Sequence, residues 1–313
     1  MTRPPKALIN AAISGLLLAA AAYVLWRELH HTSAAEIAAA ARAWSPGRLA
    51  VAAALSLAGY LLLGINEQIA LRWSGSNIGW IPGVGGSFVS HALANNLGMT
   101  IFVGGAIRAG VYARHGVTVA QSAVVTVYGA MSFGLGLAAL SGLSFLLAPA
   151  AAFQTLGAPV GLMRVTGALL AAAPLAYLAA CALIRRQVTL LGQQVALPPL
   201  WLGLVQFGFG LGDVVLSAAL MWLLIPGHGL GFATFSGGYL TAMSAGLFSG
   251  VPGGLGVFEG ALVALLPQLP RPALAAGMLG YRLFYYLLPL GISAVALAGD
   301  ALMARRQAPP AAS

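Results

Sequence analysis

Residues 199–225 read PLWLGLVQFGFGLGDVVLSAALMWLLI, an apolar stretch long enough to cross a bilayer as a helix, with one charged residue, Asp213. The whole chain has this character, because 60% of its 313 residues are hydrophobic and only 7% are charged. An ordinary soluble domain is roughly 25% charged and needs those side chains to cover its surface. The composition also excludes disordered and disulfide-rich classes. The sequence therefore predicts an all-α, polytopic membrane helix bundle.

Apolar stretches like residues 199–225 recur along the chain and are separated by short polar connectors. No connector is long enough for a soluble domain, so residues 1–313 are predicted to form a single integral membrane domain. With the interrupted segments considered next, we expect about eight membrane elements. The segments predicted to span the membrane are 7–26, 49–71, 118–148, 160–184, 199–225, 231–250 and 273–301.

Two segments, 79–105 and 249–270, are short, interrupted by Pro and Gly, and polar at membrane depth. Irregular backbone is not tolerated against lipid, so both are predicted to be broken or re-entrant and to be buried or line a wet cavity. Paired broken segments in two halves of a chain are typical of a transporter's substrate site and of inverted repeats. The alternative is that the glycines only allow close helix packing.

The net charge of +9 does not indicate a nucleic-acid partner. The Lys and Arg residues occur singly or in pairs at the borders of apolar stretches, as expected at membrane surfaces. The sequence contains no cluster with metal-ligand spacing, no Walker-type loop and no G-x-S-x-G motif. We therefore predict no metal, no cofactor and no catalytic residue.

Charged residues inside spanning segments are costly, at about 2.5–3.5 kcal/mol each, and so indicate function or pairing. Asp213 is too short to reach the membrane surface, so it must be neutral, paired, or facing a polar cavity. Glu67 is either functional or an interfacial carboxylate near Arg72. Arg108 adjoins the broken segment 79–105, where its guanidinium could bind a lipid phosphate through two hydrogen bonds.

Other polar residues lie in or beside the broken segments. The opposite charges of Glu259 and Arg282 are expected to pair inside the bundle, as architecture or as part of the site. Asn95 and Asn96 either satisfy backbone groups or line the substrate path, while His91 is more typical of a hydrogen-bonding histidine than of a ligand. The predicted substrate-binding residues are Arg108, Glu67, Asp213, Asn95, Asn96, Glu259 and Arg282.

The run SGVPGGLGVFEG at 249–260, followed by YRLFYYLLP at 281–289, resembles the lysylphosphatidylglycerol synthase transmembrane-domain family. NNLG at 95–98 and GAIRAGVY at 105–112 match as well, and the resemblance covers nearly the whole chain. The family includes the flippase portion of the multiple peptide resistance factor. The resemblance implies a multi-pass protein of the bacterial inner membrane, with structural motif residues at Pro252, Gly253, Gly254, Gly256 and Tyr281.

The resemblance also implies that the protein moves a lipid between leaflets. In the resistance-factor branch the cargo is aminoacylated phosphatidylglycerol, and the family's intramembrane charges correspond here to Glu67, Arg108 and Asp213. The family often has Tyr-Asp at Asn66-Glu67, Glu at Asp213 and His at Gly250. The loss of a titratable group at Gly250 leaves the particular cargo open.

The bifunctional relatives continue into a soluble transferase domain, whereas this sequence stops at Ser313. We therefore expect a stand-alone member that is a transporter rather than an enzyme, with a membrane lipid as substrate. A separate lipid-modifying synthase is a possible partner, and so is a second copy of the chain. The leading hypothesis is a phospholipid translocase. The alternatives are a membrane-embedded head-group transferase, a transporter of hopanoid or another lipid, and a scaffold for a separate synthase.

Overall fold

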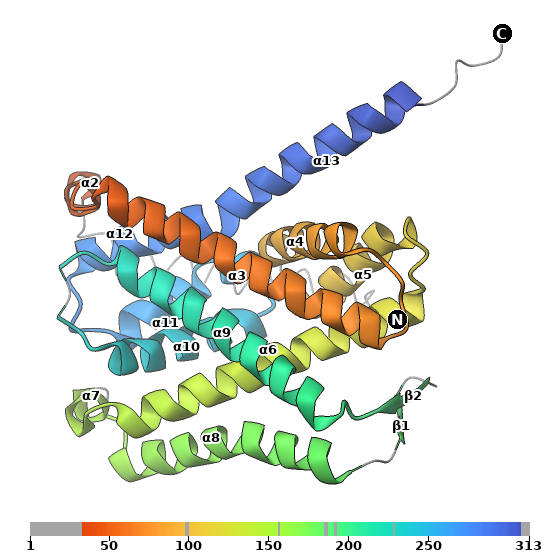
Figure 1. Ribbon diagram of the computed structural model, residues 1–313. Coiled ribbons are helices and arrows are strands. Elements are labelled where there is room, and N and C mark those ends of the chain that lie inside the picture. Colours follow the sequence, from red (N-terminus) through yellow and green to blue (C-terminus); the bar gives the residue numbers. More distant parts are fainter. Residues whose placement is uncertain are drawn as a thin grey trace, which may run out of the picture.

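The computed structural model describes residues 33–97, 100–155, 157–184, 187–190, 193–227 and 229–307. The predicted span 7–26 lies outside these residues. Helices make up the described chain apart from one short hairpin between α8 and α9, so the prediction of a helical membrane fold is confirmed (Figure 1). In chain order the elements are α2 (Ala34–Ala41), α3 (Pro46–Trp73), α4 (Trp80–Leu97), α5 (Thr100–Ala113), α6 (Val119–Leu147), α7 (Ala150–Thr155), α8 (Val160–Leu183), β1 (Gln187–Leu190), β2 (Gln193–Ala196), α9 (Leu200–Leu224), α10 (Phe232–Phe248), η1 (Pro252–Gly254), α11 (Val257–Leu265), α12 (Arg271–Tyr281), η2 (Arg282–Leu287) and α13 (Leu288–Gln307).

Five helices of the described chain are long and apolar enough to cross a membrane. Four of them are α3, α6, α8 and α9, and the fifth runs through α12, η2 and the first part of α13. The predicted span 231–250 corresponds to α10, whose 17 residues place it at the lower limit of length for a spanning helix. The protein is therefore a multi-pass membrane protein.

Two of the long helices, α3 and α6, begin at capping residues. The Ser45 side chain accepts a hydrogen bond from the Arg48 amide, and Pro46 occupies the first turn of α3. Thr118 and Gln121 form a reciprocal capping box at the start of α6. These caps satisfy amides that would otherwise lack partners, and they fix where each span begins.

Helix α6 is central to the packing, since it contacts α3, α8, α9 and α10. Its crossing with α9 is close because glycine lies on both sides. A Cβ atom at Gly210 would collide with the backbone carbonyl of Ser132, and one at Gly136 would collide with Gly210. The Ser132 hydroxyl donates to the Gln206 carbonyl at 2.7 Å, and the Gln206 amide donates to the Tyr128 carbonyl at 2.8 Å. Close backbones and buried hydrogen bonds thus join α6 to α9.

Both segments that were expected to be broken are interrupted. Segment 79–105 contains α4 and the first part of α5, two helices that pack against each other. Segment 249–270 contains the single turn η1 and the short helix α11, which packs against α10. Because α4 also contacts η1, the two broken segments meet inside the bundle.

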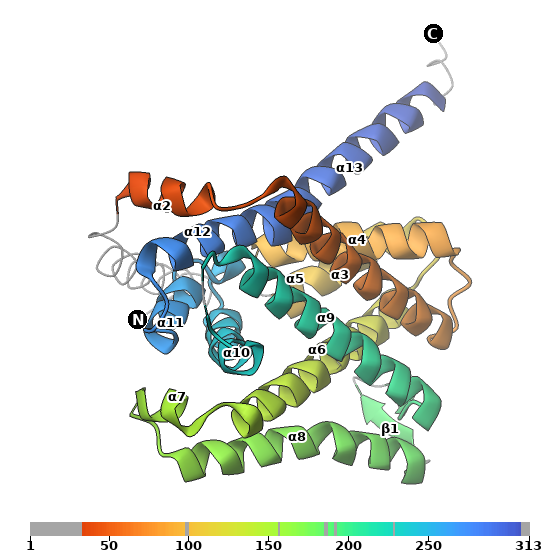
Figure 2. The ribbon, with the colours of Figure 1, turned by 60° about the vertical axis from the view of Figure 1, so that its left-hand side comes forward.

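The predicted span 273–301 is not a regular helix, because the π-helical turn η2 separates α12 from α13. A π-helical turn makes i→i+5 hydrogen bonds and often occurs at functional sites. Beyond it, α13 projects away from the other helices (Figures 1 and 2). The composition of this span predicted its length but gave no sign of the π-turn.

We predict that Gly210→Ala lowers the thermal stability of the purified chain, because the new methyl group would overlap the Ser132 carbonyl. Overpacking of this kind costs about 1–3 kcal/mol. Gly208→Ala is the matched control, since a Cβ atom there meets nothing within 4 Å. Thermal unfolding of the two variants in detergent checks this, and equal stability would contradict the close crossing.

Candidate functional site

A cavity of about 220 Å³ lies among α3, α4, α5, α6, α9, α10 and the η1 and η2 turns. Four of the predicted substrate-binding residues line it: Glu67, Asn95, Arg108 and Asp213. Its remaining polar side chains include Asn66, His91 and Thr126. Aromatic side chains complete the wall, namely Phe133, Phe258, Tyr281, Tyr285 and Tyr286.

Glu67 and Arg108 form a buried ion pair beside this cavity. The Arg108 Nε lies 2.9 Å and 3.0 Å from the two carboxylate oxygens of Glu67. Tyr112 donates to Oε1 at 2.7 Å and Ser87 donates to Oε2 at 2.9 Å, so both oxygens are fully satisfied. Glu67 is therefore not an interfacial carboxylate near Arg72, because its partner is a residue of another helix.

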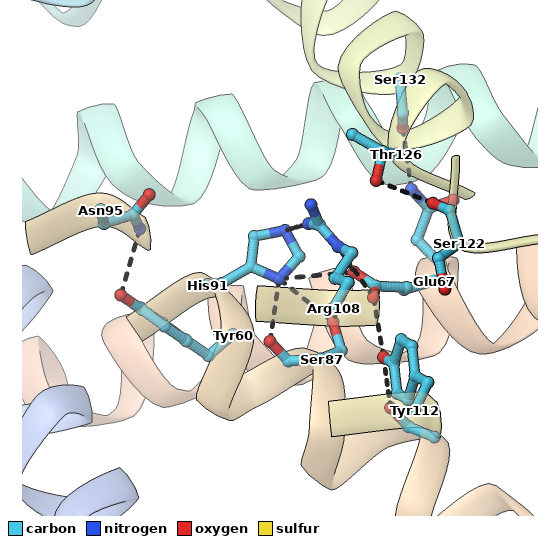
Figure 3. Close-up of polar contacts among 12 residues, drawn as sticks. Tyr60, Glu67, Ser87, His91, Asn95, Arg108, Tyr112, Ser122, Thr126 and Ser132 are labelled. Atoms are coloured by element: carbon cyan, nitrogen blue, oxygen red, sulfur yellow. Dashed lines mark hydrogen bonds and ion pairs between the residues drawn. The ribbon is translucent and has the colours of Figure 1, made fainter. Parts of the chain in front are cut away.

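His91 contacts the other end of the Arg108 guanidinium (Figure 3). The Arg108 Nη2 lies 2.8 Å from the His91 Nε2. Because a guanidinium has no acceptor, His91 Nε2 must accept this hydrogen bond and carries no proton. The ring proton then resides on Nδ1, which lies 3.0 Å from the Ser87 carbonyl. His91 is a hydrogen-bonding histidine, as expected, and it also lines the cavity.

Asp213 is the exception among the buried charges. Its side chain is only 4% exposed, and within the described part of the chain it makes no hydrogen bond or ion pair. It faces the cavity from α9, opposite Gly59 of α3. A buried carboxylate without a partner is costly. Within the described chain Asp213 is therefore not paired with a cation. It faces a cavity whose largely apolar wall also contains several polar side chains.

The two asparagines of α4 have different surroundings. The Asn95 amide donates to the Tyr60 hydroxyl at 3.2 Å and lines the cavity. The Asn96 amide donates to the Ala92 carbonyl at 2.8 Å, in the preceding turn of its own helix. The Asn96 side chain therefore satisfies a backbone carbonyl, whereas the Asn95 side chain lines the cavity.

Glu259 and Arg282 pair as expected, but they lie behind the cavity wall. The Arg282 Nε donates to Glu259 at 2.8 Å, and its Nη1 donates to the Gly253 carbonyl at 2.6 Å. Glu259 in turn accepts from the Gly256 amide at 2.7 Å. The pair thus holds both ends of the loop 253–256. Its role in substrate binding, and that of Asn96, stay predictions.

The glycines of this loop are required by its backbone conformation. Gly253, Gly254 and Gly256 have φ of +59°, +60° and +76°, a region that residues with a side chain rarely adopt. A Cβ atom at Gly254 would also lie 3.2 Å from the Gly246 Cα of α10. The loop therefore lies directly on α10, and its Gly253 and Gly254 form part of the cavity wall.

Comparison with known proteins shows to which family the chain belongs. A family model for the lysylphosphatidylglycerol synthase transmembrane region matches residues 9–293. The chain belongs to this family. It is 30% identical over 299 residues to the uncharacterized protein slr0712 of Synechocystis, which covers 95% of this chain and 93% of that protein. It is 26% identical over 243 residues to the inner membrane protein YbhN of Escherichia coli, covering 76% of each chain.

In this family member, the site contains side chains that the sequence reasoning missed. Ser87 lies four residues before His91 on α4, and Tyr112 lies four residues after Arg108 on α5, so each shares a helix face with a predicted or noted residue. This four-residue spacing could have identified Ser87 and Tyr112 from the sequence. No comparable signal placed Tyr285 and Tyr286 in the cavity wall, because their direction depends on the π-turn.

We predict that Glu259→Gln destabilises the chain by about 3 kcal/mol, because it leaves Arg282 with an uncompensated charge. This is the low end of the range for buried pairs, since the Arg282 side chain is 16% exposed and keeps the Gly253 carbonyl. Thermal unfolding in detergent measures the change. Glu36→Gln, at an exposed position in α2, is the control and should cost less than about 1 kcal/mol, because glutamine can keep the capping hydrogen bond from the Ser33 amide. Equal stability of the two variants would show that the pair does not hold the loop.

Proposed function

We propose that this protein is a phospholipid translocase of a bacterial inner membrane. It moves lipids from one leaflet to the other by passing their head groups through the cavity. The observation that carries the proposal is the unpartnered carboxylate of Asp213, facing the same cavity as the Arg108 guanidinium. A head group that carries charge needs such a path, because hydrocarbon imposes a cost of several kcal/mol on each charge.

The two charges suit the two ends of a head group. Arg108 Nη1 makes no hydrogen bond in the described chain, which leaves it available to a phosphate oxygen. Asp213 would attract an amine, as in aminoacylated phosphatidylglycerol, which makes this lipid the favoured cargo. The acyl chains would stay in the bilayer during the passage.

The architecture and the family membership support the same proposal. Two broken segments meet at the cavity, an arrangement common at transporter substrate sites. The name of the relative YbhN describes it as an inner membrane protein, which supports the proposed location. A lipid-modifying synthase partner and a homo-oligomer stay predictions, as do the transferase, hopanoid and scaffold alternatives.

Reconstitution in vesicles tests the translocase. We expect the full chain to move fluorescently labelled lysylphosphatidylglycerol between leaflets, measured by quenching of the outer leaflet with dithionite. Asp213→Asn should lower this rate about tenfold, the effect of losing one charge-assisted interaction. Its effect on labelled phosphatidylglycerol, which lacks the amine, should be smaller.

The exposed variant Glu36→Gln is the control and should transport at the wild-type rate. Rates equal to those of protein-free vesicles would contradict the proposed function. An unchanged rate for folded Asp213→Asn would remove that carboxylate from the mechanism. A new lipid species in the vesicles, detected by mass spectrometry, would support the transferase alternative instead.

A further inference from the structure

His91 is a titratable group that lines the cavity, and its contacts leave one ring nitrogen able to bind a proton. We propose that His91 binds a proton when a lipid phosphate occupies Arg108 without an amine at Asp213, so that the protein carries a proton together with an anionic lipid such as phosphatidylglycerol. This inference rests on the proposed function, because it takes the phosphate to be bound by Arg108. It adds a co-transported ion and a residue that binds it.

The geometry leaves one nitrogen of His91 able to take a proton. Nδ1 already carries the ring proton and faces the Ser87 carbonyl at 3.0 Å. Nε2 has a lone pair that accepts only the Arg108 Nη2, at 2.8 Å. The proton affinity of Nε2 therefore depends on where the Arg108 guanidinium directs its hydrogens.

Charge balance supplies the reason for coupling. Glu67 and Arg108 neutralise each other, and Arg108 is the one Lys or Arg among the described residues lining the cavity. A phosphate adds a negative charge to a buried and already neutral group, which is costly without a counter-charge. Asp213, when ionised, increases this excess of negative charge. A proton on His91 restores neutrality beside the phosphate.

The exchange can be written atom by atom. An entering phosphate oxygen takes the hydrogen bond of Arg108 Nη2, and the contact between Nη2 and His91 Nε2 breaks. A proton from solvent then bonds to the Nε2 lone pair, and the new N–H donates to a second phosphate oxygen. When the lipid leaves, the proton returns to solvent and Nη2 returns to Nε2.

The charged groups around His91 act on this protonation in opposite directions. The Glu67 carboxylate of α3 lies 3.6 Å from Nδ1 and stabilises an imidazolium, whereas Arg108 of α5 opposes it until its charge is matched by phosphate. The other titratable side chains on the packed elements and across the cavity are Tyr60, Tyr112, Tyr286 and Asp213. None of these four hydrogen-bonds to His91 in the described chain.

Calorimetry of the detergent-solubilised full chain tests the proposal. Dihexanoyl phosphatidylglycerol, a water-soluble lipid, is titrated at pH 7 in buffers of different ionisation enthalpy to count the protons taken up. We expect about one proton per lipid in the wild type. Lipid affinity should rise as pH falls, by up to about tenfold per unit, because the bound state holds the extra proton.

His91→Gln keeps an oxygen that accepts from Arg108 but cannot take a proton, so the count should fall to near zero and the pH dependence should disappear. Thr126→Val is the matched cavity variant and should keep the count near one, because the Thr126 hydroxyl donates to the Ser122 carbonyl and not to His91 or Arg108. Wild-type binding without proton uptake, or uptake lost in Thr126→Val and kept in His91→Gln, would overturn the proposal.

Two further arms separate this inference from the translocase proposal. Glycerophosphoglycerol, the deacylated head group, tests whether the phosphate ester alone drives proton uptake. The same number of protons per ligand as for the lipid would link proton uptake to the phosphate. A count of zero would overturn that link. Lipid transport in vesicles without proton linkage would refute the role of His91 and leave the translocase intact. No binding of any phosphate ligand would overturn both.

Discussion

The ion pair between Glu67 and Arg108 is the interaction on which the arrangement of the cavity depends. A charge inside a bilayer is stable only if it is paired, hydrogen-bonded or hydrated. The pair meets this condition with Tyr112 and Ser87 as additional donors, and it thereby fixes α3, α4 and α5 relative to one another. The α4–α5 hairpin is therefore held by a buried polar network as well as by apolar packing.

The second broken segment, 249–270, is also held by a buried ion pair. Glu259 and Arg282 tie the loop 253–256 to the π-turn, just as Glu67 and Arg108 tie one broken segment to a spanning helix. The second pair also satisfies backbone groups of an interrupted segment, namely the Gly253 carbonyl and the Gly256 amide. The Arg282 guanidinium also lies 4.6 Å from the centre of the Tyr286 ring, which forms part of the cavity wall.

Asp213 differs from the acids of these two ion pairs, because it has no cationic partner in the described chain. Two buried acids of the described chain have arginine partners, and the third faces the cavity. A carboxylate in that position can be compensated by whatever enters the cavity, whether a cationic group or a proton. The cavity thus combines a saturated ion pair, a neutral histidine and an unmatched acid, a set of groups whose charges change when a ligand enters.

The sequence by itself determined the environment and the elements. Sparse charge and long apolar stretches imply a helical membrane protein, and Pro and Gly within 79–105 and 249–270 imply interrupted segments there. The cost of intramembrane charge also singles out Glu67, Arg108 and Asp213 from the sequence alone. These inferences hold because burial in lipid constrains composition locally, along a single helix.

Only the tertiary structure decided which charges meet. Glu67 lies five residues from Arg72 in the chain, yet its partner is Arg108, and Asp213 has no partner in the described residues. Likewise, Glu259 and Arg282 support a loop, and His91 accepts from Arg108 instead of standing alone. Pairing depends on how separate helices cross. The crossing angles and distances follow from packing between residues that are far apart in the sequence, such as the close contact of Gly136 with Gly210, and from the π-turn.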